Sequence, residues 1–304
     1  MTTMPTRRLG GLQVSAIGLG EMPMSLAGRP DEAQSIRTIH AALDAGVTLI
    51  DTADAYCIDD SDTGHGERLV AKALAAWPGD RDGVLVATKG GHTRQGREWG
   101  LDGRPEYLRQ ACEASLQRLG VEAIGLYQFH RPDPKVPFIE SVGALAELRA
   151  AGKVRLVGLS NVSVDQIRQA RELVEVASVQ NEFSPRFRRS EGELAWCAAN
   201  RIAFLPWSPL GGIGRGRDLG GRHRAFAEVA EAHVVSPQQV ALAWELAKAP
   251  VVIPIPGSSR PETILDSVAS LLSLQYPDFE VIVINEKAWQ NLSPAQRERG
   301  RQLV

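Results

Sequence analysis

The chain has 304 residues, of which 43% are hydrophobic and 23% are charged, and its formal net charge is −2. These values are typical of a globular protein with a large core, and they exclude extended disorder and the strongly basic surface of a nucleic-acid-binding protein. The three cysteines, Cys57, Cys112 and Cys197, lie far apart, which argues against a disulfide framework or a CxxC metal site. There is no apolar signal-peptide core and no run of about 20 apolar residues, so we expect a cytoplasmic protein without a membrane partner.

Short runs rich in apolar and β-branched residues recur along the chain. The first two, at residues 7–9 and 13–15, flank Gly10-Gly11 and predict a hairpin. Eight further runs predict eight strands, at residues 16–19, 47–50, 84–87, 124–129, 154–159, 178–180, 202–206 and 251–254.

The segments between these runs carry the signals of helix ends. Asp31 precedes an apolar stripe of helical period that Gly46 ends, and capping boxes open at Ser163 and Ser236. Strict alternation of strand and helix predicts a parallel sheet, and eight such units predict a closed (β/α)₈ barrel. We expect one domain over residues 1–304, with the N-terminal hairpin and an additional C-terminal helical segment. No stretch fits G-x-G-x-x-G, which argues against a Rossmann domain, and the Gly- and Arg-rich residues 210–234 predict a mobile loop.

Polar residues follow most of the predicted strands. Active sites of such barrels lie at the carboxyl ends of the strands, so these residues predict a ligand-binding rim. They are Asp51, Lys89, His130, Ser160-Asn161, Gln180, Trp207-Ser208 and Gly257-Ser258.

Tyr56 lies in the loop after the second predicted strand and is a candidate proton donor. A phenol titrates near pH 10, and we expect the ammonium of Lys89 to lower that pKa while Asp51 holds the lysine in place. His130 can donate a hydrogen bond to a substrate carbonyl oxygen. Each residue alone has an ordinary structural explanation, but four of them at one rim favour a catalytic group.

The motifs containing these residues resemble those of the aldo-keto reductase superfamily. The resemblance covers about residues 7–272 and rests on residues 8–20, 51–56 (Asp-Thr-Ala-Asp-Ala-Tyr), 87–91, 128–133, 158–161, 180–184, 207–211 and 253–257. It implies that Asp51, Tyr56, Lys89 and His130 match the family's catalytic tetrad. The implied reaction is the reduction of aldehydes or ketones to alcohols with a nicotinamide cofactor, with Tyr56 as general acid.

The resemblance also implies a cofactor site. Ser160 and Asn161, with Gln180 beside them, would bind the nicotinamide carboxamide, Trp207 would stack on its ring, and Ser208 and Leu210 would line the pyrophosphate. The remaining expected contacts are Gly20, Glu21, Met22, Asp51, Pro209, Gly212, Gly257, Ser258, Ser259, Arg260 and Thr263.

The segment Gly257-Ser-Ser-Arg260, which opens a helix at Pro261, can bind a phosphate and favours NADPH. Thr263 stands where many relatives carry a second basic residue, and Ser267 replaces a frequent Asn, so NADH stays open.

Residues expected around a small carbonyl substrate are Met22, Tyr56, His92, His130 and Arg131. Arg131 either binds an acidic substrate group or has a structural role. We expect no metal and no nucleic-acid partner. Residues after about 272 depart from the family's pattern and receive no role in the pocket.

Two other functions stay open. The first is a nicotinamide-binding regulatory subunit with little catalytic role. The second is a Schiff-base aldolase using Lys89. Imine chemistry needs a lysine with a low pKa, whereas the nearby Asp51 would raise the pKa of Lys89, which argues against this function. For Cys57, next to Tyr56, the favoured interpretation is a small buried residue, and the alternative is a thiol activated by Lys89.

Overall fold

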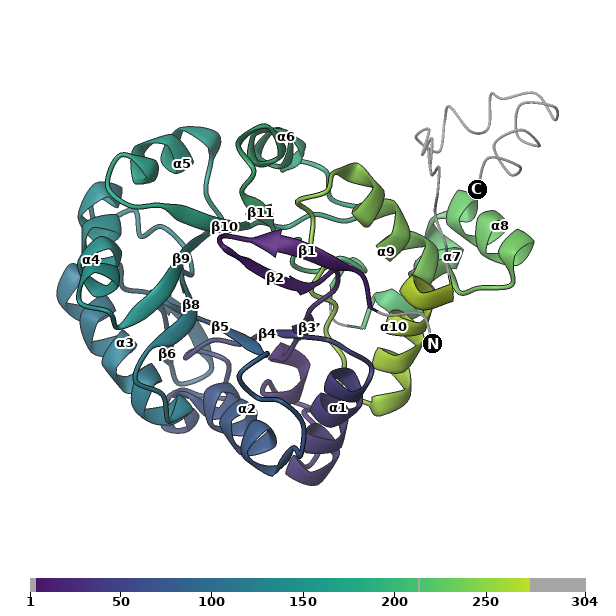
Figure 1. The fold of residues 1–304 in the computed structure, drawn as a ribbon, viewed down its shortest axis with the longest axis horizontal. Coiled ribbons are helices and arrows are strands. Elements are labelled where there is room, and N and C mark those ends of the chain that lie inside the picture. The colour runs from purple at the N-terminus through teal and green to yellow at the C-terminus, as the bar shows by residue number, and fades with distance from the viewer. Residues whose placement is uncertain (1–3, 213, 274–304) are drawn as a thin grey trace.

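The computed structural model describes residues 4–212 and 214–273. Within them, seven parallel strands form one curled sheet in the order β11-β10-β9-β8-β5-β4-β3, which helices surround (Figure 1). The strands are β3 (Leu19–Gly20), β4 (Leu49–Asp51), β5 (Leu85–Gly90), β8 (Ile124–Phe129), β9 (Val154–Ser160), β10 (Val176–Gln180) and β11 (Ala203–Phe204).

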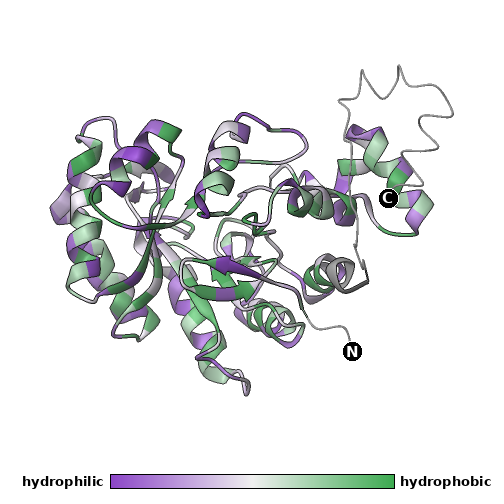
Figure 2. Cartoon of the chain, turned by 45° about the horizontal axis from the view of Figure 1, so that its top comes forward, coloured by the Kyte–Doolittle hydropathy of each residue, from purple (hydrophilic) through white to green (hydrophobic). Residues whose placement is uncertain are grey.

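The helices alternate with these strands along the chain. Their bounds are α1 (Glu32–Asp44), α2 (His65–Ala76), α3 (Pro105–Leu119), α4 (Phe138–Ala150), α5 (Val164–Arg171), α6 (Glu191–Asn200), α7 (Leu219–Arg222), α8 (Arg224–His233), α9 (Pro237–Lys248) and α10 (Pro261–Ser273), with short 3-10 turns η1 (Met22–Met24), η2 (Asp60–Asp62) and η3 (Gly216–Asp218). Hydrophobic residues line the strands and hydrophilic ones mark the outer helix faces (Figure 2). None of these described helices is long and apolar enough to cross a membrane.

The predicted strand at residues 251–254 closes the ring without forming a regular strand. Phe204 bridges to Val252 on one side, and Gly20 bridges to Gly257 on the other. Pro254 and Pro256 lack the N–H groups that a ladder requires, yet their carbonyl oxygens accept from the N–H groups of Gly18 (2.8 Å) and Gly20 (2.9 Å). The predicted (β/α)₈ barrel is therefore confirmed, with its eighth position irregular.

The local signals at helix ends are confirmed. The Asp31 carboxylate caps α1, and both capping boxes form at Ser163 and Ser236. Gly46 follows α1 with φ +90°, the left-handed conformation that favours glycine. The predicted loop at residues 210–234 is wrong, because η3, α7 and α8 lie within it. Phe226 of α8 packs against Trp244 of α9, so a tertiary contact stabilises this helix.

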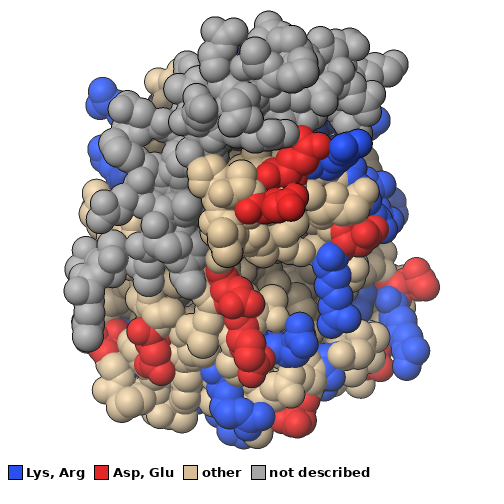
Figure 3. Space-filling model, turned by 90° about the vertical axis from the view of Figure 1, so that its right-hand side faces the viewer, with Lys and Arg blue, Asp and Glu red and all other residues tan. Residues whose placement is uncertain are grey.

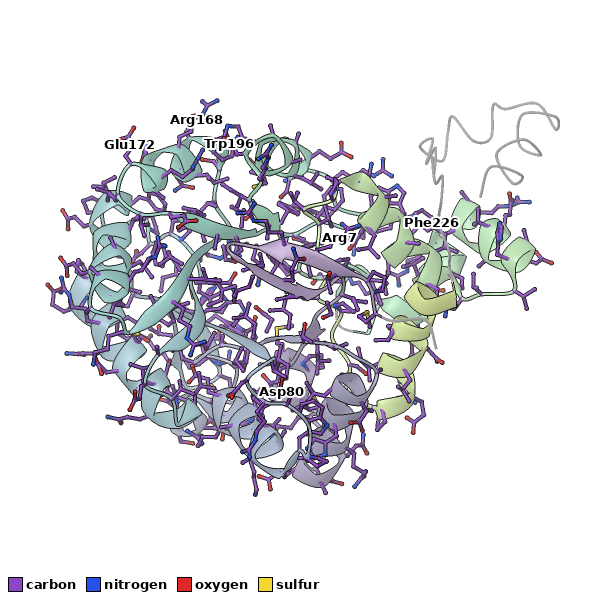
Figure 4. The ribbon with its side chains drawn as sticks, in the orientation of Figure 1. Arg7, Asp80, Arg168, Glu172, Trp196 and Phe226 are labelled. Carbon is purple, nitrogen blue, oxygen red and sulfur yellow. The ribbon has the colours of Figure 1, made fainter. Side chains whose placement is uncertain are left out.

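The N-terminal hairpin is also confirmed, as β1 (Thr6–Leu9) paired antiparallel with β2 (Leu12–Ser15). It lies across one end of the barrel (Figure 1). Arg7, labelled in Figure 4, donates to the carbonyl oxygens of Leu246 (2.8 Å), Ala249 (2.7 Å) and Val252 (2.5 Å). Burial lowers the pKa of Arg7 to about 10, so the guanidinium stays charged at neutral pH beside the carboxyl end of α9.

Two observations concern the surface charge and the C-terminal segment. On the face in Figure 3, acidic and basic side chains are mixed over the described residues, as the net charge of −2 suggests. The additional C-terminal helical segment is described only as far as Ser273 of α10, and the rest of that prediction lies outside the described residues.

Glu245 of α9 is fully buried, and neither of its carboxylate oxygens has a hydrogen-bond partner in the described part of the chain. Burial raises its pKa well above the usual value, so the folded protein holds a proton that the unfolded chain releases. Its contribution to stability is therefore largest at acid pH and is lost as the pH rises from the ordinary carboxyl value toward the folded one.

We expect Glu245→Leu to raise the free energy of unfolding at neutral pH by about 1–3 kcal/mol, the typical penalty of an unsatisfied buried group. Denaturant unfolding at several pH values should also show that the variant loses less stability than the wild type as the pH rises above the ordinary carboxyl value. Glu231→Leu, at an exposed position of α8, is the control and should leave both quantities nearly unchanged. A Glu245→Leu protein with wild-type stability at every pH would contradict this account.

Candidate active site

Lys89 at the end of β5 is fully buried at the centre of the site. Its Nζ donates to Asp51 Oδ2 (2.6 Å), to the Thr52 carbonyl oxygen (2.9 Å) and to the Tyr56 hydroxyl (3.0 Å). Burial lowers its pKa, but the Asp51 carboxylate and the Tyr56 hydroxyl outweigh that effect, and the net pKa is raised. The ammonium therefore stays charged, with all three protons donated.

Asp51 at the end of β4 is held by donors from three strands. Its Oδ2 accepts from Lys89, and its Oδ1 accepts from Gln180 Nε2 (2.7 Å) and Gln128 Nε2 (3.1 Å). Gln180, expected beside the nicotinamide, thus donates to the Asp51 carboxylate in this structure. Gln128 received no role from the sequence, because only the neighbouring strands show what its amide contacts.

Tyr56 lies in the loop after β4 and is 7% exposed. Burial raises its pKa, and Lys89 lowers it as predicted but by less, so the net pKa is raised. The sequence showed the lysine but not the burial, which dominates here. The phenol consequently keeps its proton at neutral pH.

His130 follows β8, and its ring packs edge-on against Tyr56 with centroids 5.7 Å apart. Its Nδ1 is buried without a partner among the described residues. Burial, followed by the charge of Lys89, lowers its pKa well below the usual range. The imidazole is therefore neutral at pH 7 and has one N–H to donate.

A second hairpin, β6 (His92–Gln95) with β7 (Glu98–Leu101), lies beside this group and was not predicted. His92 packs edge-on against both His130 (4.2 Å between centroids) and Trp99 (5.4 Å). Its Nδ1 is 3.0 Å from the Gly100 carbonyl oxygen, and burial lowers its pKa to about 4. Gly96, at the turn of this hairpin, has φ +55°. A glycine at such a turn is the feature of the sequence that could have indicated the hairpin.

Arg94 fixes this hairpin to the loop that carries Tyr56. Its guanidinium stacks 4.0 Å from the Trp99 ring and donates to the carbonyl oxygens of Cys57 (2.6 Å) and Ile58 (3.1 Å). The Cys57 thiol is fully buried, donates to the Ala55 carbonyl oxygen (3.3 Å) and has a pKa raised by burial. These contacts agree with the favoured interpretation of a small buried residue. Arg131, expected at the substrate, is exposed.

Asn161 links His130 to Trp207, at the expected nicotinamide site. Its Nδ2 donates to the His130 carbonyl oxygen (3.0 Å) and to Ser160 Oγ (2.9 Å), and its Oδ1 accepts from Trp207 Nε1 (3.3 Å). Asn161 and Ser208 have φ values of +59° and +55°, a conformation uncommon outside glycine that concentrates at functional sites. The half-buried Trp207 ring is thus oriented by its neighbours.

Gly20 and Gly257 bring two strand ends into close contact. A Cβ on Gly20 would lie 2.8 Å from the Ile255 carbonyl oxygen, and one on Gly257 would lie 2.7 Å from Pro23. Side chains are excluded at both positions, and of the two glycines only Gly257 is exposed, so its backbone can be approached closely by a ligand.

Hydrogen bonds fix the conformation of the segment that opens α10. The buried Ser258 hydroxyl donates to the Arg260 carbonyl oxygen (2.9 Å), and the Ser259 carbonyl oxygen accepts from Gln34 (2.8 Å). Arg260 is exposed and donates to Thr263 Oγ1 (3.3 Å). Thr263 therefore orients the Arg260 guanidinium. A basic residue at position 263, as in many relatives, would instead have added a second positive charge.

Three arginines that the sequence analysis missed lie near the expected pyrophosphate loop. A small pocket brings them together with Leu210 and Gly211, and it is lined by Ser184, Pro185, Arg186, Leu210, Gly211, Arg215, Leu219, Arg222 and His223. They come from separate segments, so no local motif marked them. Pro209 is buried, and Gly212 has φ +102°.

Two expected cofactor contacts precede this region in the chain. Met22 in η1 is half-buried. The Glu21 side chain is fully buried and faces Ser25 and Thr52, so only its backbone can contact a cofactor.

Comparison with known proteins agrees with this geometry. The Aldo/keto reductase family pattern matches residues 16–288. An uncharacterised oxidoreductase of Schizosaccharomyces pombe is 36% identical over 270 residues (86% of this chain, 83% of the relative). A 6-dehydroglucose reductase of Novosphingobium aromaticivorans is 36% identical over 276 residues (87% of this chain, 90% of the relative).

Solved structures show the same similarity. Glycerol dehydrogenase of Gluconobacter oxydans has a TM-score of 0.76 and 27% identity (98% of this chain, 94% of that one). An aldo-keto reductase of Klebsiella pneumoniae in complex with NADPH has a TM-score of 0.73 and 27% identity (98% of this chain, 95% of that one). These matches show that the chain is an oxidoreductase of the aldo/keto reductase family.

Proposed function

We propose that this protein reduces aldehyde or ketone carbonyls to alcohols with NADPH, and that Tyr56 is the general acid. The observation that carries the proposal is the 3.0 Å contact between Lys89 Nζ and the Tyr56 hydroxyl. An ammonium group has no lone pair, so the phenol oxygen must accept in this bond. The phenol's own proton is therefore left for a substrate oxygen.

The bound nicotinamide would supply a hydride to the carbonyl carbon, and the chain's own residues would handle the oxygen. The neutral His130 donates a hydrogen bond that orients the carbonyl. Tyr56 transfers its proton to the oxygen as negative charge develops there, and Lys89 stabilises the resulting phenolate. Asp51 keeps the ammonium in place, and water returns the proton to Tyr56.

The residues at the rim fit a nicotinamide dinucleotide. Trp207 offers a flat face that Asn161 orients, and the exposed backbone at Gly257 suits close approach of a phosphate. Arg260 is exposed and can bind a 2′-phosphate, which supports NADPH over NADH. The arginines beside Leu210 add positive charge near the expected pyrophosphate.

The other functions fit less well. A Schiff-base aldolase needs a neutral lysine, whereas Lys89 has a raised pKa and donates all three protons. A purely regulatory subunit would not need the Tyr56–Lys89–Asp51 arrangement. The free, buried cysteines 57, 112 and 197 support a reducing, cytoplasmic location.

Tyr56→Phe should lower turnover with NADPH and a model aldehyde by about 10²–10⁴-fold, the usual loss when a general acid is removed. Cofactor affinity should stay unchanged, since only a hydroxyl is removed. Tyr127→Phe is a matched control, because that buried hydroxyl has no partner among the described residues, and it should retain full activity. A Tyr56→Phe enzyme with nearly wild-type turnover would show that the proton comes from elsewhere.

Arg260→Ala should weaken NADPH binding by about 10- to 100-fold, corresponding to about 1.5–3 kcal/mol for a charge-assisted hydrogen bond, and should barely change NADH binding. Fluorescence titration with both cofactors measures the ratio. Arg155→Ala, an exposed position of β9 at the opposite end of the barrel, should keep the wild-type ratio. If Arg260→Ala also keeps it, another group recognises the 2′-phosphate.

Asn161→Ala and Asn161→Gly both remove the amide that orients Trp207, so each should weaken NADPH binding by about 1–2 kcal/mol. Glycine adopts φ +59° freely, so the Gly variant should be about 1 kcal/mol more stable than the Ala variant. Cofactor titration and thermal unfolding separate the two effects. Wild-type affinity in both variants would remove Asn161 from the cofactor site.

A further inference from the structure

A second carboxyl group, that of Glu21, lies behind the Lys89–Asp51 pair. Glu21 follows β3, its N–H donates to the Asp51 carbonyl oxygen (2.9 Å), and its side chain is fully buried. Helix α2 packs tightly on the carboxyl, since a Cβ on Gly66 would lie 2.4 Å from Glu21 Oε2. The catalytic scheme above does not use this group.

Thr52 connects Glu21 to the catalytic lysine. Its hydroxyl donates to Glu21 Oε2 (2.9 Å), and its carbonyl oxygen accepts from Lys89 Nζ (2.9 Å). Glu21 thus holds the residue that supplies one of the three acceptors of Lys89. A change in the charge of the Glu21 carboxyl can therefore affect the Lys89 ammonium through Thr52.

Ser25 connects the same carboxyl to His65 in the first turn of α2. Its hydroxyl contacts Glu21 Oε1 and lies 2.9 Å from His65 Nδ1. When Glu21 is ionised, Ser25 donates to it and accepts from His65 Nδ1. When Glu21 is protonated, it donates to Ser25, which donates to His65. The half-buried His65 therefore provides a route for the proton toward the surface without rearrangement of heavy atoms.

The charges around this chain set where Glu21 titrates. Lys89 and Asp51 act on the carboxyl from β5 and β4. At the other end of the hydrogen-bond chain, the charged groups that act on His65 are Arg29, Asp62, Arg68 and Glu32. Burial raises the pKa of Glu21 to about 7, with the hydroxyl hydrogen bonds and Lys89 opposing the increase and Asp51 adding to it. Both charge states are therefore populated at neutral pH.

We propose that Glu21 is a positioning residue of the catalytic centre, and that the proton it exchanges through Ser25 and His65 makes carbonyl reduction faster when Glu21 is protonated than when it is ionised. An ionised Glu21 places a second negative charge behind Lys89. That charge destabilises the Tyr56 phenolate and makes the phenol a weaker acid. The inference rests on Tyr56 being the general acid, as proposed above.

The test is the pH dependence of the single-turnover rate of NADPH oxidation with a model aldehyde. The wild-type rate should fall by about three- to tenfold in a step near the Glu21 pKa of about 7. Glu21→Gln is neutral and of the same shape, so it should be fast and flat across this range. Ser25→Ala removes a donor to the carboxylate, so its step should move to higher pH.

Glu245→Gln, at another fully buried carboxyl, in α9, is the matched control and should keep the wild-type step. Infrared difference spectra of the cofactor-free protein below and above the step supply a second measurement. They should show a buried carboxylic-acid band that is lost as the pH rises and that Glu21→Gln lacks.

The outcomes separate the two proposals. If Tyr56→Phe keeps its activity, the proposed function fails. If Tyr56→Phe is inactive but Glu21→Gln keeps the step or the infrared band, only the role of Glu21 fails. If Glu21→Gln does not fold, the Ser25→Ala variant decides alone. A step in its rate at the same pH as in the wild type would overturn the proposed role of Glu21.

Discussion

The ion pair between Lys89 and Asp51 is the interaction on which the rest of the site depends. Both side chains are almost completely buried, and isolated charges in such a position are strongly unfavourable. The structure compensates for this because Lys89 has three acceptors and Asp51 accepts from Lys89, Gln128 and Gln180. Removal of one partner would leave a buried charge uncompensated, so the pair constrains every element that contributes to it.

This constraint reaches the register of the sheet. Asp51, Lys89, Gln128 and Gln180 come from β4, β5, β8 and β10, and Lys89 lies directly opposite Gln128 in the β5–β8 ladder. A slip of one residue in that ladder would turn the lysine toward the helices and away from the barrel interior. The ordinary hydrophobic packing of the strands and the polar network therefore favour the same alignment.

The two ends of the barrel serve different purposes. At one end, the hairpin and Arg7 satisfy carbonyl groups and close the core against water. At the other, Asn161 and Ser208 keep uncommon backbone conformations, each at an expense of about 1–2 kcal/mol. In that conformation, Asn161 contacts both the His130 carbonyl oxygen and the Trp207 indole, and so joins the proposed catalytic group to the proposed cofactor site.

The sequence by itself determined the features that depend on neighbouring residues. Helix caps at Asp31, Ser163 and Ser236 follow from three or four adjacent side chains, and strand-end chemistry at Asp51 and Lys89 follows from alternation along the chain. The family motifs likewise consist of residues that are adjacent in the sequence. For this reason the barrel and its hairpin could be predicted, and Asp51, Tyr56, Lys89 and His130 could be proposed as one group.

Only the tertiary structure decided the features that depend on distant residues. The eighth barrel position is irregular: it bridges to Phe204 on one side and to Gly20 on the other, and Pro254 and Pro256 contribute only carbonyl acceptors to it. Helix α8 forms because Trp244 packs against it, and the hairpin at His92 is held by contacts with the Tyr56 loop. The pKa of Tyr56 is raised because burial exceeds the effect of Lys89, and Glu21 faces inward to Ser25 and Thr52. Burial and long-range charge are properties of the packed molecule, and no local pattern in the chain encodes their magnitude.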